Sequence, residues 1–194
     1  IAMRLICSEA SVSNKKIMIG DLDQDDWDKL LEATSRMMEA PLLIDDQSGI
    51  SPNHIRKVAR QAKEEYPDLG MIIVDYLQLM QSSRQQNSRE QEIADISRSM
   101  KAIAKEFNLP VIALSQLNRD LERRADKRPM MSDLRESGAL EQDADLILFI
   151  YRDEIYNSES EDKNIAEINL AKHRNGEIGG CRLAFIGQYT KFAN

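Results

Sequence analysis

Residues 71–80 constrain the fold of this chain more than any other stretch, because they read Met-Ile-Ile-Val-Asp-Tyr-Leu-Gln-Leu-Met. A long apolar run rich in β-branched residues predicts a strand that is buried on both faces, as in the centre of a parallel sheet covered by helices. Asp75 follows the β-branched part, where a carboxylate is unfavourable unless something offsets its desolvation. Ligands of open α/β sheets bind at this end of the strands, so Asp75 is well placed to hold a hydrated Mg²⁺.

Four apolar residues followed by an aspartate also form a motif of P-loop ATPases, in which the aspartate serves the metal ion on the phosphates. The motif is short and weakly specific. Many buried strands end in an aspartate that only caps the next helix. The interpretation of Asp75 therefore depends on the rest of the chain.

The composition is that of a folded domain with one sizeable core, since 42% of the 194 residues are hydrophobic and 30% are charged. The net charge of −7 excludes a protein coated in basic surface, but not a local basic patch that binds nucleic acid. Cys7 and Cys181 lie far apart, which indicates a reducing compartment and no metal-ligand spacing. No apolar run would span a bilayer and no signal peptide is found, so we expect a cytoplasmic protein without a membrane partner.

Apolar periodicity and capping residues divide the chain into alternating helices and strands. Ser51 followed by Pro52 starts one helix, and Asn175-Gly176 predicts a tight turn that closes an antiparallel hairpin. This order of elements predicts an α/β sheet with a mixed edge. We expect helices at 1–12, 24–39, 52–66 and 89–107, and strands at 41–45, 71–80, 110–116, 144–151, 165–172 and 181–186, of which the four between 71 and 172 should be buried.

Gln116 ends the predicted strand at 110–116 as Asp75 ends the β-branched run, so both side chains should face one cleft. A carboxamide there can orient a water or contact a γ-phosphate, although a polar residue that merely closes a strand onto a loop is the ordinary alternative. The following loop, 117–135, carries six basic and four acidic side chains, a net of +2 in a chain of −7. It is either a solvated, salt-bridged loop or one that contacts phosphates, and its length favours a function.

Two further segments carry candidate residues. Residues 134–138 read Leu-Arg-Glu-Ser-Gly, where a glycine beside a short helical turn can present backbone N–H groups to a phosphate, or can simply join a loop to a strand. Lys172 and Arg174 lie at the tip of the hairpin, where we expect both to be solvent-exposed. Exposed cations usually have no special function, but in ring-shaped ATPases a projecting arginine can reach a neighbour's γ-phosphate.

Together, these segments resemble the ATPase domain of bacterial replicative DNA helicases of the DnaB type, over essentially all 194 residues. Five blocks in the expected order carry the resemblance, and their combination is highly specific although each block alone is not. The Arg-Glu-Ser-Gly block and the Lys-x-Arg of the hairpin favour a helicase over other proteins of the same fold. The blocks are IVDYLQLM at 73–80, ALSQLNR at 113–119, DLRESG at 133–138, EQDAD at 141–145 and KHRNG at 172–176.

The resemblance implies a RecA-like three-layer sandwich with a mostly parallel central sheet and a C-terminal antiparallel hairpin. It implies a homohexamer that assembles through the ATPase interface, uses ATP and Mg²⁺, and couples hydrolysis to translocation on single-stranded DNA and to duplex unwinding. Primase and a helicase loader are implied as partners, in a primosome at replication forks near the nucleoid. Residues 1–194 would be part of this ATPase domain, within the C-terminal part of a longer protein.

Roles for single residues follow from the same resemblance. Asp75 matches the metal-binding aspartate, which reaches Mg²⁺ through water, and Gln116 matches the glutamine that couples the γ-phosphate to DNA. Arg174 matches the arginine finger, with Lys172 as its companion at the neighbour's phosphates. A loop that lines the channel of the ring and contacts single-stranded DNA, largely through backbone amides, matches Arg135, Glu136 and Gly138.

The sequence also departs from the family. It contains no N-terminal strand with a phosphate loop ending in Lys and Ser or Thr, and the catalytic glutamate would precede Ile1. Glu177 stands where the family commonly has proline. The alternatives are a RecA-type recombinase or clock-type ATPase, and a catalytically dead RecA-like scaffold or loader module. A coding sequence upstream of Ile1 that holds a Gly-rich loop ending in Lys-Thr or Lys-Ser would identify the motor.

We expect the isolated 194-residue chain to show no measurable ATP hydrolysis, because the groups that cradle the β- and γ-phosphates are absent from its sequence. Nucleotide binding should be weak as well, since Asp75 alone offers Mg²⁺ a single carboxylate. Calorimetric titration of the chain with ATP and Mg²⁺ measures this directly. Micromolar binding would contradict the interpretation that the chain is one part of a longer motor.

Overall fold

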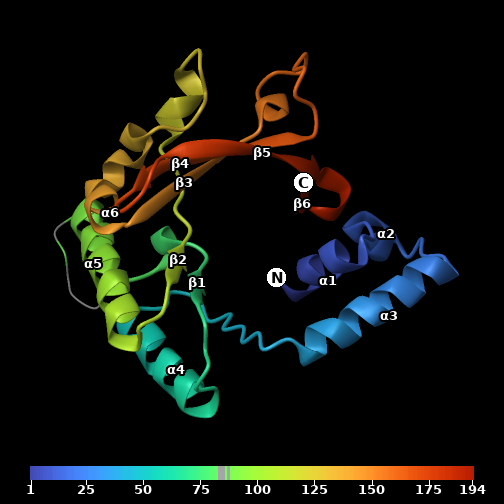
Figure 1. Ribbon diagram of the computed structural model, residues 1–194, viewed down its shortest axis with the longest axis horizontal. Coiled ribbons are helices and arrows are strands. Elements are labelled where there is room, and N and C mark those ends of the chain that lie inside the picture. The colour runs from blue at the N-terminus through green and yellow to red at the C-terminus, as the bar shows by residue number, and fades with distance from the viewer. Residues whose placement is uncertain (83–85, 87) are drawn as a thin grey trace. The chain divides into compact units, whose positions relative to one another are not determined.

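The computed structural model describes residues 1–82, 86 and 88–194, with the side chains of 135–137 outside the description. Contacts divide the described chain into two compact units (Figure 1). Residues 1–45, 150–169 and 180–194 form the first unit, and residues 46–149 and 170–179 form the second. All the candidate site residues belong to the second unit.

The helix α5 (Arg89–Phe107) is the centre of the second unit. At its start the Ser88 hydroxyl accepts a hydrogen bond from the Gln91 N–H, 3.3 Å away, and at its end Asn108 adopts the left-handed conformation with φ 51°. These bounds confirm the helix predicted at 89–107. Its apolar residues recur every three or four positions and therefore share one face, which buries Ile93, Ile96, Met100, Ile103 and Phe107.

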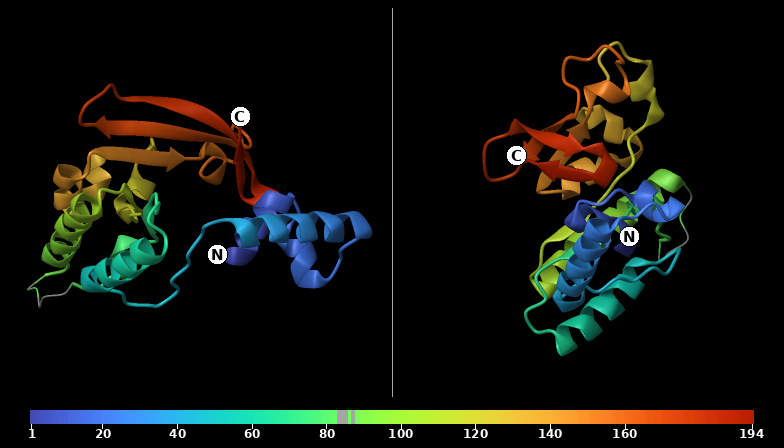
Figure 2. Two further views of the ribbon diagram at one scale, coloured as in Figure 1. Left: turned by 60° about the horizontal axis from the view of Figure 1, so that its bottom comes forward. Right: turned by 90° about the vertical axis from the view of Figure 1, so that its right-hand side faces the viewer.

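The helix α4 (Pro52–Glu65) packs beside α5 (Figures 1 and 2). Ser51 caps its first turn, as predicted. On the outer side of the pair, Arg56 and Arg60 donate to the two carboxylate oxygens of Glu106 in α5, at 2.7 and 3.0 Å. The hydrogen bond from Arg56 is the main cause that lowers the pKa of Glu106. Apolar packing and charge pairing thus join the same two helices.

The strands β1 (Ile72–Val74) and β2 (Val111–Ala113) pair in parallel, with Ile73 opposite Ile112. Val74 is 5% exposed and belongs to the core built from α4 and α5, whereas Ile73 is 61% exposed. Successive strand residues point to opposite faces, and the two helices pack against only one of them. The prediction that this strand is buried on both faces is therefore wrong.

Three predicted strands are shorter than expected or absent, and of residues 110–116 only β2 at 111–113 is a strand. Of residues 71–80 only 72–74 form a strand, after which the 3₁₀ helix η1 (Leu77–Leu79) turns Leu77 into the core. Residues 41–45 form no strand, and Leu42, Leu43 and Ile44 are about half-exposed. A strand requires a hydrogen-bonded neighbour, and within the described chain no strand pairs with this segment.

The remaining strands form a separate sheet in the order β3-β4-β5-β6, so the described chain holds two sheets and not the single mostly parallel sheet that was predicted. Residues 174–178, between β4 and β5, are too few for a parallel crossover, which confirms the antiparallel hairpin. In β3 the side chains of Ile147 and Phe149 are buried while Leu148 between them is 57% exposed, so this strand too has one open face. The strands are β3 (Leu146–Tyr151), β4 (Ile165–His173), β5 (Gly179–Ile186) and β6 (Lys191–Ala193).

In the first unit, α1 (Ala2–Ala10) packs against α3 (Gln24–Glu39), which confirms both predicted helices. Asp23 begins α3 through a reciprocal capping box with Asp26. The Asp26 carboxylate also receives Lys16 Nζ, 2.6 Å away, from α2 (Asn14–Ile19). None of the helices in the described residues is long and apolar enough to cross a membrane.

Candidate functional site

The parallel pairing of β1 with β2 brings Asp75 and Gln116 to one edge of the pair. Val74 lies opposite Ala113, and the Leu114 N–H donates to the Val74 carbonyl at 2.9 Å. Asp75 follows Val74 directly, and Gln116 lies three residues beyond Ala113, so both residues lie past the carboxyl ends of their strands. This is the edge at which open α/β sheets bind ligands. What the two residues bind there stays a prediction.

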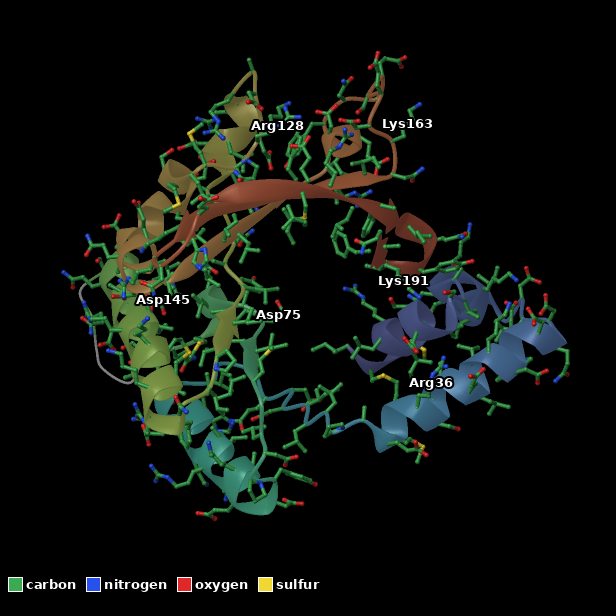
Figure 3. The ribbon with its side chains drawn as sticks, viewed as in Figure 1. Arg36, Asp75, Arg128, Asp145, Lys163 and Lys191 are labelled. Atoms are coloured by element: carbon green, nitrogen blue, oxygen red, sulfur yellow. The ribbon has the colours of Figure 1, made fainter. Side chains whose placement is uncertain are left out.

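The Asp75 side chain is exposed and, within the part of the chain that the structure describes, has no hydrogen-bonding or ionic partner (Figure 3). The described residues also contain no cluster of three or more His, Cys, Asp or Glu side chains that could enclose a metal ion. A lone free carboxylate does not suit a metal ion that requires a protein cage. It suits Mg²⁺, which keeps most of its waters and is often held by one or two carboxylates together with substrate phosphates.

Gln78 in η1 connects the two strand ends, and the sequence interpretation missed it. Its Oε1 accepts a hydrogen bond from the Gln116 N–H at 3.1 Å, and its Nε2 donates to Ser115 Oγ at 2.9 Å and to the Gln116 carbonyl at 3.3 Å. Arg89 at the start of α5 donates to the Gln78 carbonyl at 2.5 Å. A single polar residue between Leu77 and Leu79 was the only signal in the sequence. The carboxamide therefore fixes the backbone of Gln116 relative to the loop that follows Asp75.

An ion pair within the basic loop after Gln116 joins two parts of this loop. Arg124 donates to both carboxylate oxygens of Asp133, at 3.1 and 2.8 Å, and Asp133 is only 8% exposed. The Asn118 N–H donates to the Asp133 carbonyl at 3.0 Å. The bidentate pair between Arg124 and Asp133 shapes the loop. For Arg124 the structure therefore favours the interpretation of a salt-bridged loop over that of a phosphate contact. Two 3₁₀ helices form most of the loop, η2 (Arg119–Arg123) and η3 (Met131–Ser137).

The segment predicted to contact DNA is described only in part. The side chains of Arg135 and Glu136 lie outside the described residues. Gly138 begins the short helix α6 (Gly138–Asp143) in an ordinary right-handed conformation, and a Cβ atom added there would meet no atom within 4 Å. Neither backbone conformation nor space therefore requires a glycine at this position.

Lys172 caps the C-terminal end of α6 from the neighbouring strand β4. Its Nζ donates to the carbonyls of Glu141 at 2.5 Å, Ala144 at 2.7 Å and Gln142 at 3.4 Å. The last carbonyls of a helix lack partners within the helix and carry its negative end, so they attract a cation. Lys172 is half-buried as a result, and the prediction that it is solvent-exposed is wrong.

Arg174 is exposed as predicted, but its guanidinium lies against its own chain. One terminal nitrogen, Nη1, is 3.1 Å from Asp145 Oδ1, and the other donates to the Gln142 carbonyl at 3.2 Å. The Arg174 backbone N–H donates to the Asp145 carbonyl at 2.9 Å. The two ends of the fork thus have one partner in the last turn of α6 and one partner just beyond it.

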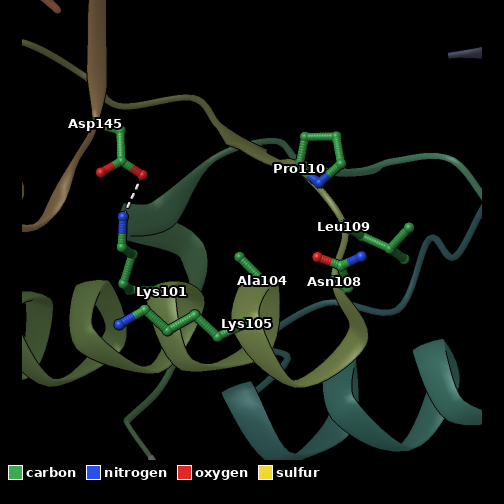
Figure 4. Close-up of a pocket in the computed structure, with 7 residues that line it drawn as sticks. All are labelled: Lys101, Ala104, Lys105, Asn108, Leu109, Pro110 and Asp145. Atoms are coloured by element: carbon green, nitrogen blue, oxygen red, sulfur yellow. Dashed lines mark hydrogen bonds and ion pairs between the residues drawn. The ribbon is translucent and has the colours of Figure 1, made fainter. Parts of the chain in front are cut away.

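Asp145 connects Arg174 to α5. Its other oxygen, Oδ2, pairs with Lys101 Nζ, beside an open hollow of about 410 Å³ that is lined by α5, the segment directly after it and Asp145 (Figure 4). The hydrogen bond from Lys101 is the main cause that lowers the pKa of the Asp145 carboxyl, and the nearby charges of Arg174 and Lys172 lower this pKa further. The sequence marked the block at 141–145 but suggested no role for Asp145 and no partner on α5.

Comparison with known proteins gives one consistent result. Residues 1–194 match the DnaB-like helicase C terminal domain family. Over its full length the chain is 51% identical to the replicative DNA helicase DnaB of Geobacillus stearothermophilus and 56% identical to that of Pasteurella multocida, and it covers 43% and 42% of those proteins. The chain thus spans less than half the length of the curated relatives it matches.

Solved structures agree with this result. The fold matches a DnaB-like replicative helicase, whose structure is described with its interactions with primase, at a TM-score of 0.95 and 46% identity, over 99% of this chain and 46% of the other. It matches a second solved structure, of an ATPase domain, at a TM-score of 0.94 and 46% identity, over 98% of this chain and 68% of the other. The mixed α/β fold is therefore that of DnaB ATPase domains, and the chain belongs to the DnaB-like helicase C-terminal domain family.

Proposed function

We propose that this chain is part of the ATP-hydrolysing domain of a longer, ring-shaped replicative DNA helicase, which couples ATP hydrolysis to translocation on single-stranded DNA. The observation that carries the proposal is the edge at which Asp75 and Gln116 follow two parallel strands and are connected through Gln78. Family membership over all 194 residues supports it. The RecA-like three-layer arrangement, with residues 1–194 as a partial domain, belongs to the same proposal.

In this proposal Asp75 holds Mg²⁺ through water at the nucleotide phosphates. The exposed carboxylate, which has no partner among the described residues, supports this role, because Mg²⁺ retains its waters and takes few protein ligands. Phosphoryl transfer needs positioning and electrostatic stabilisation, with little covalent work for the protein. A phosphate loop and a glutamate from other parts of the protein would complete the site. The 194 residues alone are accordingly expected to be inactive toward ATP.

Gln116 would couple the state of the γ-phosphate to DNA. Leu117, the next residue, packs in a cluster with Leu134 of η3, and Asn118 bonds to the Asp133 carbonyl at 3.0 Å. A shift of the Gln116 backbone would therefore move residues 133–134, which directly precede Arg135. This gives a short physical connection between the nucleotide edge and the segment that we propose contacts DNA phosphates through Arg135, Glu136 and Gly138.

Arg174 would act on the nucleotide of an adjacent subunit. It lies at the turn between β4 and β5, and not among the residues that form the Asp75 edge. In a homohexamer joined through the ATPase interface, its guanidinium would stabilise transition-state charge at the neighbour's γ-phosphate, with Lys172 as its companion. The carbonyls that hold Lys172 support a fixed position for this part of β4.

We also propose primase and a helicase loader as partners, at replication forks in the cytoplasm. A solved relative that is described with its interactions with primase supports the first of these partners. Co-purification of primase with the full-length ring is the simplest check.

Two other functions are weaker. A RecA-type recombinase or clock-type ATPase would share the edge of Asp75 and Gln116, but identities of 51% and 56% to replicative helicases favour the helicase. A catalytically dead scaffold or loader module would bind partners without hydrolysing ATP. ATPase assays on the full-length protein separate this last alternative from the motor.

In a full-length helicase that contains this chain, Gln78→Ala should lower DNA-stimulated ATP turnover by roughly tenfold and leave KM for ATP nearly unchanged. The substitution removes side-chain hydrogen bonds of about 1 kcal/mol each that orient Gln116, and about 1.4 kcal/mol corresponds to a factor of ten in rate. Steady-state assays with and without single-stranded DNA measure both constants. Gln61→Ala, on the exposed side of α4, is the control. Full stimulation by DNA in Gln78→Ala would show that Gln116 needs no such support.

Replacing Arg135 by alanine in the same protein should weaken single-stranded DNA binding and reduce its salt slope by about one unit, as the loss of one phosphate contact predicts. Fluorescence anisotropy at several salt concentrations gives affinity and slope, with Arg98→Ala on the exposed side of α5 as a charge-matched control. The ring should stay intact. Unchanged affinity and slope in an intact ring would remove Arg135 from the DNA contact.

Arg174→Ala should reduce ATP turnover on the order of 10³-fold and leave much of the nucleotide binding in place. Rings that mix Arg174→Ala subunits with subunits lacking the phosphate-loop lysine should regain some activity, because an intact phosphate loop then meets an intact Arg174 from the neighbour. Native mass spectrometry must first confirm the mixed rings. If confirmed mixed rings recover no activity at any ratio, the action across subunits loses its support. Parental turnover in Arg174→Ala rings would reduce Arg174 to a surface charge.

A further inference from the structure

We propose that Asp145 is a positioning residue that holds Arg174 retracted against its own subunit and releases it to the neighbouring subunit's γ-phosphate as the transition state forms. The inference rests on the proposed role of Arg174 as an arginine finger, and it adds to that role a competitor for the guanidinium. Asp145 itself touches neither nucleotide nor DNA in this proposal.

The retracted state follows from the partners of the Arg174 fork. An arginine binds a phosphate oxyanion through its terminal nitrogens, which form a planar fork. Here Nη1 lies 3.1 Å from Asp145 Oδ1 and Nη2 donates to the Gln142 carbonyl at 3.2 Å, so both terminal nitrogens already have partners in the same chain. Engagement of a phosphate therefore requires that these partners be exchanged.

The hold is weak enough to be reversible. The side chains of Arg174 and Asp145 are 49% and 53% exposed, and ion pairs with this exposure contribute little because water competes for both charges. A γ-phosphate carries more negative charge than one carboxylate, and in a closed nucleotide site it is shielded from water. Exchange of Asp145 for phosphate therefore becomes favourable as the transition state forms at the neighbour's γ-phosphate, and not on nucleotide binding alone.

Lys101 lowers the free-energy cost of releasing Arg174 from Asp145. It pairs with Asp145 Oδ2, whereas Arg174 pairs with Oδ1, so the carboxylate keeps a cation when Arg174 leaves (Figure 4). Removing one partner of an ion pair is unfavourable mainly because the other charge is left without a partner. Here the Asp145 carboxylate still has Lys101 as its partner after Arg174 leaves. Lys172 is held separately by three carbonyls of the α6 end and does not compete for Asp145.

Three variants of the full-length ring test the inference through turnover. Asp145→Asn removes the charge and keeps the shape, so it should raise kcat about two- to fivefold, the range that an exposed ion pair supports, with KM for ATP nearly unchanged. Lys101→Gln leaves the carboxylate to Arg174 alone and should lower kcat by a similar factor. The double variant Asp145→Asn/Arg174→Ala should match Arg174→Ala alone, because Asp145 acts only through Arg174.

Two controls exclude an effect on structure alone: the dependence of kcat on salt concentration, and the removal of a comparable ion pair elsewhere on the surface. The ratio of kcat between Asp145→Asn and parent should approach one as the KCl concentration rises, since salt screens a half-exposed pair. Asp162→Asn breaks a comparable Asp–Arg pair with Arg182 in the first unit and should leave kcat unchanged. Native mass spectrometry confirms ring assembly, and Lys101→Gln decides the matter if the Asp145→Asn ring does not assemble.

Two results would overturn the inference, and they differ from a failure of the proposed function. If Arg174→Ala is inactive while Asp145→Asn has parental kcat or a lower one, Arg174 remains the finger but Asp145 does not restrain it. If Arg174→Ala retains parental turnover, the finger assignment fails, and the role of Asp145 fails with it.

Discussion

The burial of one face of α5 is the interaction on which the second unit depends. Ile93, Ile96, Met100 and Ile103 lie in one core with side chains of α4, β1 and η1, and each is at most 5% exposed. This burial fixes the rotation of the helix about its axis, and therefore the direction of every polar residue on it. Arg89 reaches the Gln78 carbonyl, Ser97 donates to Asp143 at 2.7 Å, and Lys101 reaches Asp145. One apolar face thus places three polar contacts along the candidate site.

The positions of Lys172 and Arg174 depend on a different interaction, the attraction of cations to the unsatisfied carbonyls at the end of a helix. The helix α6 is short, but its last carbonyls and the two residues beyond it bind Lys172 and Arg174 together. Among the described residues the acceptors of Lys172 are three carbonyls, whereas Arg174 shares the half-exposed Asp145 carboxylate with Lys101. The two cations are two residues apart, with Lys172 in β4 and Arg174 in the turn that follows it, and their acceptors differ in kind.

Local signals predicted local structure well. The bounds of α5 follow from apolar periodicity, a serine cap and an asparagine in the left-handed conformation, all within a few residues of one another. Burial was predicted poorly, because it depends on segments that are distant in the sequence. The residues around Ile73 have the composition of a fully buried strand, yet the helices cover only the opposite face of β1 and leave Ile73 exposed. The position of Asp75 directly after β1 was predictable from its motif, whereas β2 ends at Ala113, three residues before Gln116. The partners of Lys172 were not, because its acceptors lie 28 to 31 residues away and are backbone atoms.

The contacts of Gln78 set an unusual chemical requirement on one position. Its Oε1 must accept from a backbone N–H while its Nε2 donates to a hydroxyl and a carbonyl, so the position needs an acceptor and a donor on the same planar group. A glutamate would turn its second oxygen toward the Gln116 carbonyl, and a lysine could not accept at all. Methionine matches the length of glutamine and would still leave a backbone N–H unpaired. Glutamine therefore fits these partners better than glutamate, lysine or methionine does, and asparagine is one methylene shorter and would not reach them from the same backbone.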